Sequence, residues 1–417
     1  MQKRYDVKDF GALGDGRTLC TQSLQRAIDT ASEAKCPVYI SEGTFLSGSL
    51  FLRENTRLVF EKDAILLGSQ DLSDYAIEET RFEGRICIWP IALVNAKNVN
   101  NISMEGQGII DGNGLPFWTQ FWNQRAAAIK QDEPFSNRDV MRPRLLFFEN
   151  CKNVSVSGIT LQNAAFWHFH LYLCQHVCID SIAVRAPHKG VRAASSDAID
   201  IDASSGITIK NSFFETDDDC ICLKSGKGPT AHLVNPPTEQ IVIENCIFGF
   251  GHGVVTLGSE AALVRNITVK NCQVVGENSL VRCKFRTDTR QEFSKILFDG
   301  ITISNGGWLF DVRTWNSRQD EILALGRQPS FLTDMIVRNI IVKGLVSPGI
   351  LGEPNTLLTM KGILLENISI TCLTDGSLGL TRSDSLEQQT GGLPGCLTYD
   401  IQQDISFTNV MINGKPL

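Results

Sequence analysis

The feature of this sequence that most constrains its fold is a strand-corner-strand pattern in residues 154–412. Each copy has two alternating apolar residues, a corner of Asn, Gly or Ser, and a second alternating pair. The copies are VSVSGITL (154–161), VCIDSIAV (177–184), ITIKNSFF (207–214), IVIENCIF (241–248), ITVKNCQV (267–274), ILFDGITI (296–303), MIVRNIIV (335–342), ILLENISI (363–370) and ISFTNVMI (405–412). Alternation with a period of two predicts strands, and Asn and Gly tolerate the backbone of a sharp corner.

The spacing of the corners distinguishes a solenoid from a set of hairpins. Successive corners are 23 to 42 residues apart. They stand at Gly158, Ser181, Asn211, Asn245, Asn271, Gly300, Asn339, Asn367 and Asn409. Hairpins need turns of about two to five residues, whereas units that return after a whole coil of sequence are typical of solenoids. We therefore predict an all-β fold, a single-stranded right-handed parallel β-helix, whose corner asparagines stack in ladders that satisfy buried bend groups.

The whole chain, residues 1–417, is expected to be one β-helix domain, because no linker-like segment divides it. The open end of a solenoid exposes core and strand edge and needs a cap. Residues 21–34 have apolar side chains at helical spacing and predict an amphipathic capping helix. Those apolar positions are Leu24, Ala27, Ile28 and Ala31. The Gly- and Ser-rich residues 373–400 predict a loop insertion.

Charge and composition exclude several classes of function. A formal net charge of −7 argues against a nucleic-acid partner or an anionic membrane surface. There is no apolar run of about 18 residues, so no membrane span is expected. The first thirty residues show no signal peptide, and the compartment stays open between the cytoplasm and a trimmed periplasmic or secreted protein. The oligomeric state stays open as well.

The cysteine pattern argues against a metal site. The sequence has 13 cysteines and no Cys-x-x-Cys pair, so neither a structural zinc site nor a redox pair is predicted. Several cysteines lie within apolar alternation and are expected to be buried core residues. These are Cys178, Cys220, Cys222, Cys246 and Cys272. No cofactor and no metal ion are expected.

Acidic, imidazole and cationic side chains recur at about the length of one coil. They are Asp197, Asp218, Asp219, His252, Arg282 and Lys284, and successive motifs are 21 to 33 residues apart. Residues one coil apart lie roughly 4.7–4.9 Å from each other, so these side chains are expected to line a single cleft. Each motif alone fits a solvated turn or face. Their joint spacing favours a functional site.

In this order, the motifs resemble those of the polygalacturonase family of pectin-degrading enzymes, glycoside hydrolase family 28. The family pattern Asn-Thr-Asp, Asp-Asp, Gly-His-Gly and Arg-x-Lys has counterparts in SSD (195–197), DD (218–219), GHG (251–253) and RCK (282–284). The segments DFGALGDG (9–16), GTFLSGSLFL (43–52), GIIDGNG (108–114) and NAAFWHFH (163–170) are similar to further family segments. The resemblance covers most of the chain.

The resemblance implies metal-independent, inverting hydrolysis of α-linked galacturonic acid in pectin or oligogalacturonides. It implies that Asp218 is the general acid, that Asp197 and Asp219 activate water, and that His252 tunes a neighbouring carboxylate. Crowded carboxylates cannot all ionise cheaply, which agrees with one group that keeps its proton.

The resemblance also implies how an acidic protein binds an acidic sugar. Arg282 and Lys284 would hold the uronate carboxylate of the pectic substrate, the guanidinium through paired hydrogen bonds and the ammonium as a point charge.

The sequence departs from the family pattern in three places. Ser195 and Ser196 stand where the family has Asn and Thr, and Asp217 adds a carboxylate. The insertion at 117–139 and the loop at 373–400 are expected to close one end of the groove, which favours release of sugars from a chain end.

Three alternatives remain at this point. A hydrolase of another galacturonic-acid linkage, in rhamnogalacturonan, would share the same motifs. A pectate-lyase-like enzyme would use the aspartates to bind calcium and an arginine as the base. A non-catalytic sugar-binding β-helix would need no poised acid.

Overall fold

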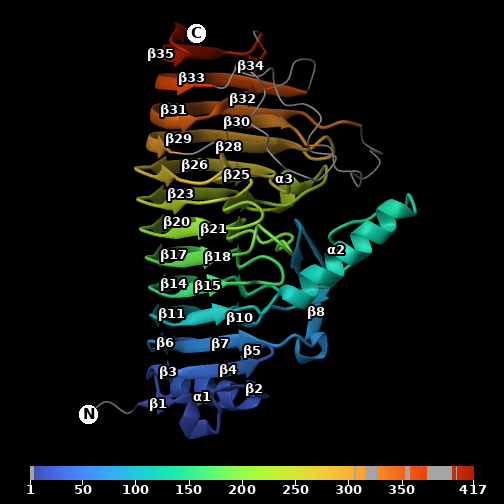
Figure 1. Cartoon of the computed structure of the whole chain (residues 1–417), viewed down its shortest axis with the longest axis vertical. Helices are drawn as coiled ribbons and strands as arrows, with labels where there is room; N and C mark the ends of the chain where they lie inside the picture. The colour runs from blue at the N-terminus through green and yellow to red at the C-terminus, as the bar shows by residue number, and fades with distance from the viewer. Residues whose placement is uncertain (1–3, 305–306, 316–325, 353–356, 373–396, 401) are drawn as a thin grey trace. The chain divides into compact units, whose positions relative to one another are not determined.

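The computed structural model describes residues 4–304, 307–315, 326–352, 357–372, 397–400 and 402–417. The chain divides into two compact units, Met1–Asp218 and Asp219–Leu417. In each unit the strands stack as successive rungs of a parallel β-helix (Figure 1). The single-domain organisation stays a prediction, and most of the loop predicted at 373–400 lies outside the described residues.

The first unit contains three parallel ladders and one hairpin. The first ladder is β1 (Tyr5–Asp6), β3 (Val38–Ile40), β6 (Arg57–Phe60), β11 (Asn100–Gly106), β14 (Lys152–Ser157), β17 (Gln175–Asp180) and β20 (Ser205–Lys210). The second is β2 (Asp15–Leu19), β4 (Gly43–Ser47), β7 (Ala64–Gly68), β12 (Ile109–Asp111), β15 (Thr160–Gln162), β18 (Ala183–Arg185) and β21 (Phe213–Glu215). The third is β5 (Leu50–Phe51), β10 (Val94–Lys97), β13 (Leu146–Glu149), β16 (Phe169–Tyr172) and β19 (Ile199–Asp202). The antiparallel hairpin is β8 (Ile77–Phe82) and β9 (Arg85–Pro90).

The second unit has the same plan, and several of its strands are longer. Its outer ladder is β23 (Thr238–Glu244), β26 (Leu263–Lys270), β29 (Gln291–Ile303), β31 (Ser330–Leu345), β33 (Leu358–Thr371) and β35 (Ile405–Ile412). The short strand β24 (Ile247–Phe248) pairs with β27 (Gln273–Val274), which in turn pairs with the end of β29. Strand β36 (Lys415–Pro416) pairs antiparallel with β35. The ladder that carries the polar residues is β22 (Ile221–Lys224), β25 (Val255–Leu257), β28 (Asn278–Phe285), β30 (Gly307–Thr314), β32 (Ser347–Leu351) and β34 (Thr398–Tyr399).

The register within each unit reproduces the sequence repeat. Val154 pairs with Val177, and Ile267 pairs with Ile296, so equivalent apolar positions of successive copies are direct neighbours. All nine predicted corners have positive φ, from 52° at Asn211 to 72° at Gly158. The strand-corner-strand prediction is therefore confirmed at the level of backbone conformation.

The asparagine ladder forms, but it lies at the surface. Asn409 Nδ2 donates to Asn367 Oδ1 at 3.0 Å, and Asn367 Nδ2 donates to Asn339 Oδ1 at 3.1 Å. All three side chains are exposed. The expectation that these amides satisfy buried bend groups was wrong, because a left-handed corner residue directs its side chain away from the coil interior.

The helix predicted at 21–34 forms, and the described part of the chain contains further helical elements that the sequence did not predict. Helix α1 (Thr21–Glu33) buries Leu24, Ala27, Ile28 and Ala31 against the first strands of its unit, as the cap was expected to do. Helix α2 (Leu115–Lys130) begins just before the insertion predicted at 117–139, overlaps its first part and projects beside the rungs of the first unit (Figure 1). The remaining helical elements are the 3₁₀ turns η1 (Val7–Phe10) and η2 (Leu72–Asp74) and the short α3 (Ala231–Val234).

The interior of each unit is filled by the inward residues of its strands, mostly Val, Ile, Leu and Phe. The cysteines in the described ranges are all free. Of the five cysteines predicted to be buried, Cys178 is half-buried and the other four are buried. No helix in the described part of the chain is long and apolar enough to span a membrane.

Candidate functional site

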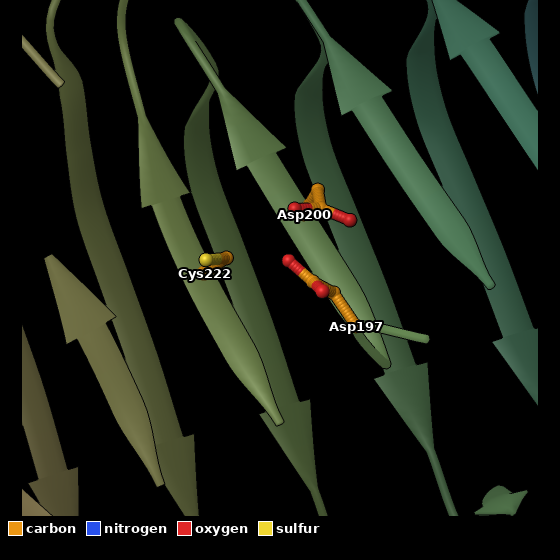
Figure 2. Close-up of side chains that lie close together, drawn as sticks. All are labelled: Asp197, Asp200 and Cys222. Atoms are coloured by element: carbon orange, nitrogen blue, oxygen red, sulfur yellow. The ribbon is translucent and has the colours of Figure 1, made fainter. Parts of the chain in front are cut away.

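Asp197 lies in the loop that leads into β19 and is buried. The backbone of this loop is held by His168, whose N–H donates to the Asp197 carbonyl at 2.9 Å and whose Nδ1 lies 3.1 Å from the same oxygen. Figure 2 shows the side chains of Asp197 and Asp200 close together. Two buried carboxyl groups therefore lie at the start of this strand.

The three consecutive aspartates have different surroundings. Asp217 is buried, and both of its carboxylate oxygens accept hydrogen bonds from Arg192 Nε, at 2.8 and 3.0 Å. The Asp217 N–H donates to Ser196 Oγ at 3.0 Å, which ties the aspartate run to the loop before β19. Asp218 is partly exposed. The carboxylate that departs from the family pattern is thus compensated by an arginine.

Arg142 is a fully buried cation in this part of the first unit. Its Nη1 donates to the Ala194 carbonyl at 2.6 Å, and its Nη2 lies 3.4 Å from Ser195 Oγ. Burial lowers the pKa of Arg142 to about 9, against the opposing effect of the negative charges of Glu83, Asp218 and Asp197. Arg142 therefore shares an electrostatic environment with two of the predicted site residues.

Deeper in the first unit, a second buried charge network surrounds Asp202. Arg81 makes hydrogen bonds of 2.7 and 3.0 Å to its two carboxylate oxygens, and His170 Nε2 lies 3.6 Å away. Burial acts to raise the pKa of Asp202, but Arg81 and His170 together lower it to about 2. Burial lowers the pKa of His168 to about 4 and that of His170 to about 3, so both imidazoles are neutral near pH 7.

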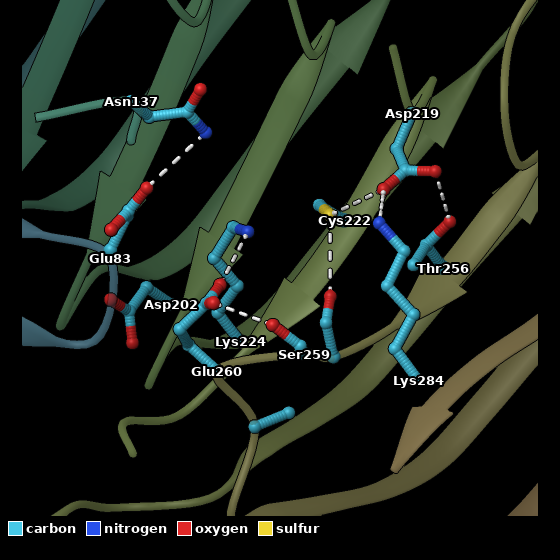
Figure 3. A network of polar contacts seen from close by, with 12 residues as sticks. Glu83, Asn137, Asp202, Asp219, Cys222, Lys224, Thr256, Ser259, Glu260 and Lys284 are labelled. Carbon is cyan, nitrogen blue, oxygen red and sulfur yellow. Dashed lines mark hydrogen bonds and ion pairs between the residues drawn. The ribbon is translucent and has the colours of Figure 1, made fainter. Parts of the chain in front are cut away.

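In the second unit, Asp219 is surrounded by donors (Figure 3). Its Oδ1 accepts from Thr256 Oγ1 at 2.7 Å and from Arg282 Nη1 at 2.9 Å, and its Oδ2 accepts from Lys284 Nζ at 2.7 Å. Only 1% of the Asp219 side chain is exposed. Burial acts to raise its pKa, but Lys284, Arg282 and His252 together hold the pKa well below its usual range. The Asp219 carboxyl is therefore ionised.

The ladder register explains why these residues meet. Thr256 pairs with Arg282 across β25 and β28, and Arg282 pairs with Asp311 across β28 and β30, so the three side chains form one row. Arg282 Nε lies 3.1 Å from Asp311 Oδ2. The Arg282 side chain is 0% exposed, so it lies between two carboxylates and does not face solvent.

Lys284 is the more accessible of the two predicted substrate-binding cations. Its side chain is 12% exposed, and its Nζ lies 4.6 Å from the ring centroid of the half-buried Trp315. An ammonium beside an aromatic ring face combines charge with an apolar surface. This arrangement suits a ligand that carries both a carboxylate and a sugar ring.

A further polar group lies at the carboxyl ends of β22, β25 and β28 in the second unit (Figure 3). Glu260 accepts from Lys224 Nζ at 3.2 Å, and Arg286 forms a paired ion contact with Asp288 at 2.6 Å. These side chains are all nearly buried and compensate one another. Their arrangement fits a structural ion network.

Sequence reasoning missed four residues of these environments: Thr256, Asp311, Arg192 and Arg142. Thr256 and Asp311 occupy the same register position as Arg282, and this signal was readable once the strands were aligned. Arg192 lies in a loop and Arg142 lies between two elements, so no periodic pattern in the sequence indicates where either side chain points.

Comparisons with known proteins agree with this architecture. Residues 78–307 match the family described as glycosyl hydrolases family 28, and residues 5–63 match one described as rhamnogalacturonase A/epimerase, pectate lyase-like. A probable polygalacturonase of Vitis vinifera is 26% identical over 380 residues, which cover 87% of this chain and 73% of that protein. An exo-poly-alpha-D-galacturonosidase of Dickeya chrysanthemi is 29% identical over 295 residues, 62% of this chain and 48% of that protein. The crystal structure of an exopolygalacturonase from Thermotoga maritima, 22% identical, covers 100% of this chain and 93% of its own with a TM-score of 0.80.

Proposed function

Because the chain belongs to glycosyl hydrolases family 28 and is a glycoside hydrolase, we propose that it hydrolyses α-linked galacturonic acid residues of pectin from a chain end. Polygalacturonases and an exo-acting galacturonosidase among its relatives support the substrate class and the exo-action. The pectic chain or oligosaccharide is the partner that the reaction needs.

The observation that carries the mechanism is the environment of Asp219. A buried carboxylate that accepts hydrogen bonds from Thr256, Arg282 and Lys284 stays ionised, as a group that activates water must be. Asp218, the next residue in the chain, is partly exposed. Adjacent carboxyl groups with different surroundings can divide the work of base and acid.

We assign the roles accordingly. Asp218 donates a proton to the glycosidic oxygen, and Asp219 and Asp197 orient and deprotonate the attacking water. His252 favours the ionised form of Asp219. Direct attack by water inverts the anomeric centre, and none of these steps needs a metal ion.

The two cations take different parts. Lys284 is accessible enough to bind the substrate carboxylate beside Trp315 while it also contacts Asp219. Arg282 is fully buried, so its contribution to affinity runs through the position of Asp219. Substitution of Lys284 is therefore expected to raise KM more than substitution of Arg282.

The test is product profiling on defined oligogalacturonides and on polygalacturonate, with Asp218→Asn as the inactive control. Wild type is expected to release a single small product from the start of the reaction. Because the α-linkage is cleaved with inversion, this product is expected to be the β-anomer. An even ladder of products would reject exo-action, and the absence of turnover on every galacturonide would reject the substrate class.

The same assay separates the remaining alternatives. The amino-terminal match to a rhamnogalacturonase-type family makes rhamnogalacturonan the second substrate to test. A lyase would form an unsaturated product that absorbs in the ultraviolet and would lose activity in EDTA. A non-catalytic binding protein would show no turnover even in its wild-type form, and its Asp218→Asn variant would retain affinity for the sugar.

A further inference from the structure

We propose that Arg142 is a positioning residue for the glycosidase reaction. Its buried guanidinium fixes the turn before Asp197 and supplies a positive charge beside Asp197 and Asp218. The proposal rests on the proposed function and adds a residue that lies outside the four sequence motifs. All of its contacts lie within the first unit.

The first argument is the backbone that Arg142 holds. Ser195 has φ of 55°, a left-handed conformation that a serine rarely adopts, and it stands two residues before Asp197. Such a conformation persists where the surroundings determine it. The Arg142 Nη1 hydrogen bond to the Ala194 carbonyl, at 2.6 Å, fixes the peptide group that enters Ser195. The direction in which the chain approaches Asp197 therefore depends on this guanidinium.

The second argument is that the guanidinium itself is held in place. Its Cζ lies 4.3 Å from the ring centroid of Phe121 on α2 and 4.7 Å from that of Phe166. The Arg142 carbonyl accepts a hydrogen bond from Trp89 Nε1 at 2.9 Å. Aromatic faces attract a cation and shield it from water, which strengthens its field. The insertion that forms α2 thus contributes to the site through Phe121.

The third argument is the charge balance around Arg142. Three carboxylates, Glu83, Asp197 and Asp218, stabilise its positive form, so by reciprocity Arg142 favours their ionised forms. Arg138 lies 3.3 Å from Glu83 and neutralises part of that charge. His168, which contacts the Asp197 carbonyl, is neutral, and the Arg192–Asp217 pair is compensated. Arg142 is therefore placed to set the charge balance of the acid and the base together.

The test uses two variants of Arg142 and a matched control. R142M removes the charge and keeps the volume, and R142K keeps the charge but loses the forked geometry. R144M is the control, because Arg144 is equally buried and also has its pKa lowered to about 9 by burial. Arg144 donates instead to Thr80 Oγ1 and to the Arg81 carbonyl, both at 2.7 Å.

The readouts are kcat, KM and the pH profile of kcat/KM on the galacturonide that wild type hydrolyses. R142M is expected to lower kcat by about a hundredfold, because small displacements of a reacting group have effects of that size. Both limbs of its profile are expected to move to higher pH by about one unit, since both carboxyl groups lose a nearby cation. R142K is expected to lower kcat with both limbs in place. R144M is expected to lower the melting temperature and to leave both limbs in place.

An R142M profile with unmoved limbs, or an equal shift in R144M, would overturn the proposal. If R142M does not fold, R142K decides, and a wild-type kcat in that variant would overturn the positioning role. Failure of the proposed function is a different result, namely no turnover by wild type. In that event NMR titration of labelled Asp carboxyl groups in wild type and R142K would still test the position of Arg142. The lysine of R142K lacks the forked guanidinium, so an unchanged Asp197 signal in this variant would contradict the proposal.

Discussion

The two units stabilise their carboxylates in different ways. In the first unit, Asp217 pairs with Arg192, whose side chain is 24% exposed. In the second unit, Asp219 has two cations and a hydroxyl, and the arginine among them is fully buried. Both carboxylates belong to the same run of three aspartates, and both are 1% exposed. Identical residue type and burial thus occur in two different environments, with a partly exposed arginine beside Asp217 and a fully buried arginine, a lysine and a hydroxyl beside Asp219.

This difference separates a structural carboxylate from a reactive one. Arg192, which is partly exposed, compensates the charge of Asp217, and the Asp217 N–H ties the run to Ser196. The hydrogen bonds from Thr256, Arg282 and Lys284 define both the charge of Asp219 and the direction of its oxygens. A group that must orient water needs the second arrangement, because catalysis depends on geometry as well as on charge.

The largest expected effect tests the difference between Asp217 and Asp219 directly. Asp219→Asn is expected to lower kcat by about a thousandfold, since it removes the ionised group assigned to activate water. Asp217→Asn is the matched control, and it is expected to lower kcat by less than about tenfold. Steady-state kinetics of the two variants on one oligogalacturonide checks this. Equal losses in both would mean that Asp217 takes part in the chemistry.

The second effect tests the difference between the two arginine partners, Arg192 and Arg282. Arg282→Met leaves Asp219 and Asp311 buried beside each other's charge, and the free energy of unfolding is expected to fall by about 3–5 kcal/mol. Because the Arg192 side chain is partly exposed, water can partly replace its guanidinium in Arg192→Met, and a fall of about 1–2 kcal/mol is expected. Urea unfolding of both variants measures the difference, and the reverse order would contradict the assigned environments.

Much of the fold and part of the site could be predicted from the sequence. The corners from Gly158 to Asn409 were readable because a left-handed residue between alternating segments is a local requirement. The cap over 21–34 was readable because the apolar spacing of an amphipathic helix is also a local pattern. The partners of Asp219 were only half readable: Arg282 and Lys284 stood out as a motif, whereas Thr256 becomes its neighbour through strand register. Arg142 and Arg192 could not be predicted, since a buried arginine gives no periodic signal and its direction is set by tertiary packing.

The third effect concerns a feature of the first unit, the buried histidines His168 and His170. Their folded pKa values, about 4 and about 3, lie below the usual value, so the unfolded chain binds more protons between pH 6.5 and pH 4. Their contribution to stability is complete above pH 6.5 and falls as the pH decreases, by about 2 kcal/mol for each histidine at pH 5. Asp202 loses its contribution only at lower pH, near its folded pKa of about 2.

Unfolding free energies between pH 7.5 and pH 5 check this expectation, with His168→Gln as the comparison. The variant is expected to be less stable at pH 7.5 and to lose less stability as the pH falls. A wild-type curve and a variant curve that stay parallel would show that His168 is not the titrating group.

The smallest expected effect concerns an exposed polar residue of the second unit and its contribution to the free energy of unfolding. Asn367 is an exposed corner with φ of 54°, and it both donates to Asn339 and accepts from Asn409. Asn367→Ala is expected to lower the free energy of unfolding by about 1–2 kcal/mol, because alanine is strained in this conformation and makes no ladder hydrogen bond. Asn367→Gly removes the same hydrogen bonds without the strain, so its loss is expected to be smaller by about 1 kcal/mol. Urea unfolding of the pair separates backbone strain from the ladder. Equal losses would assign the whole effect to the side-chain amides, and the corner would then be maintained by the ladder and not by the left-handed preference of asparagine.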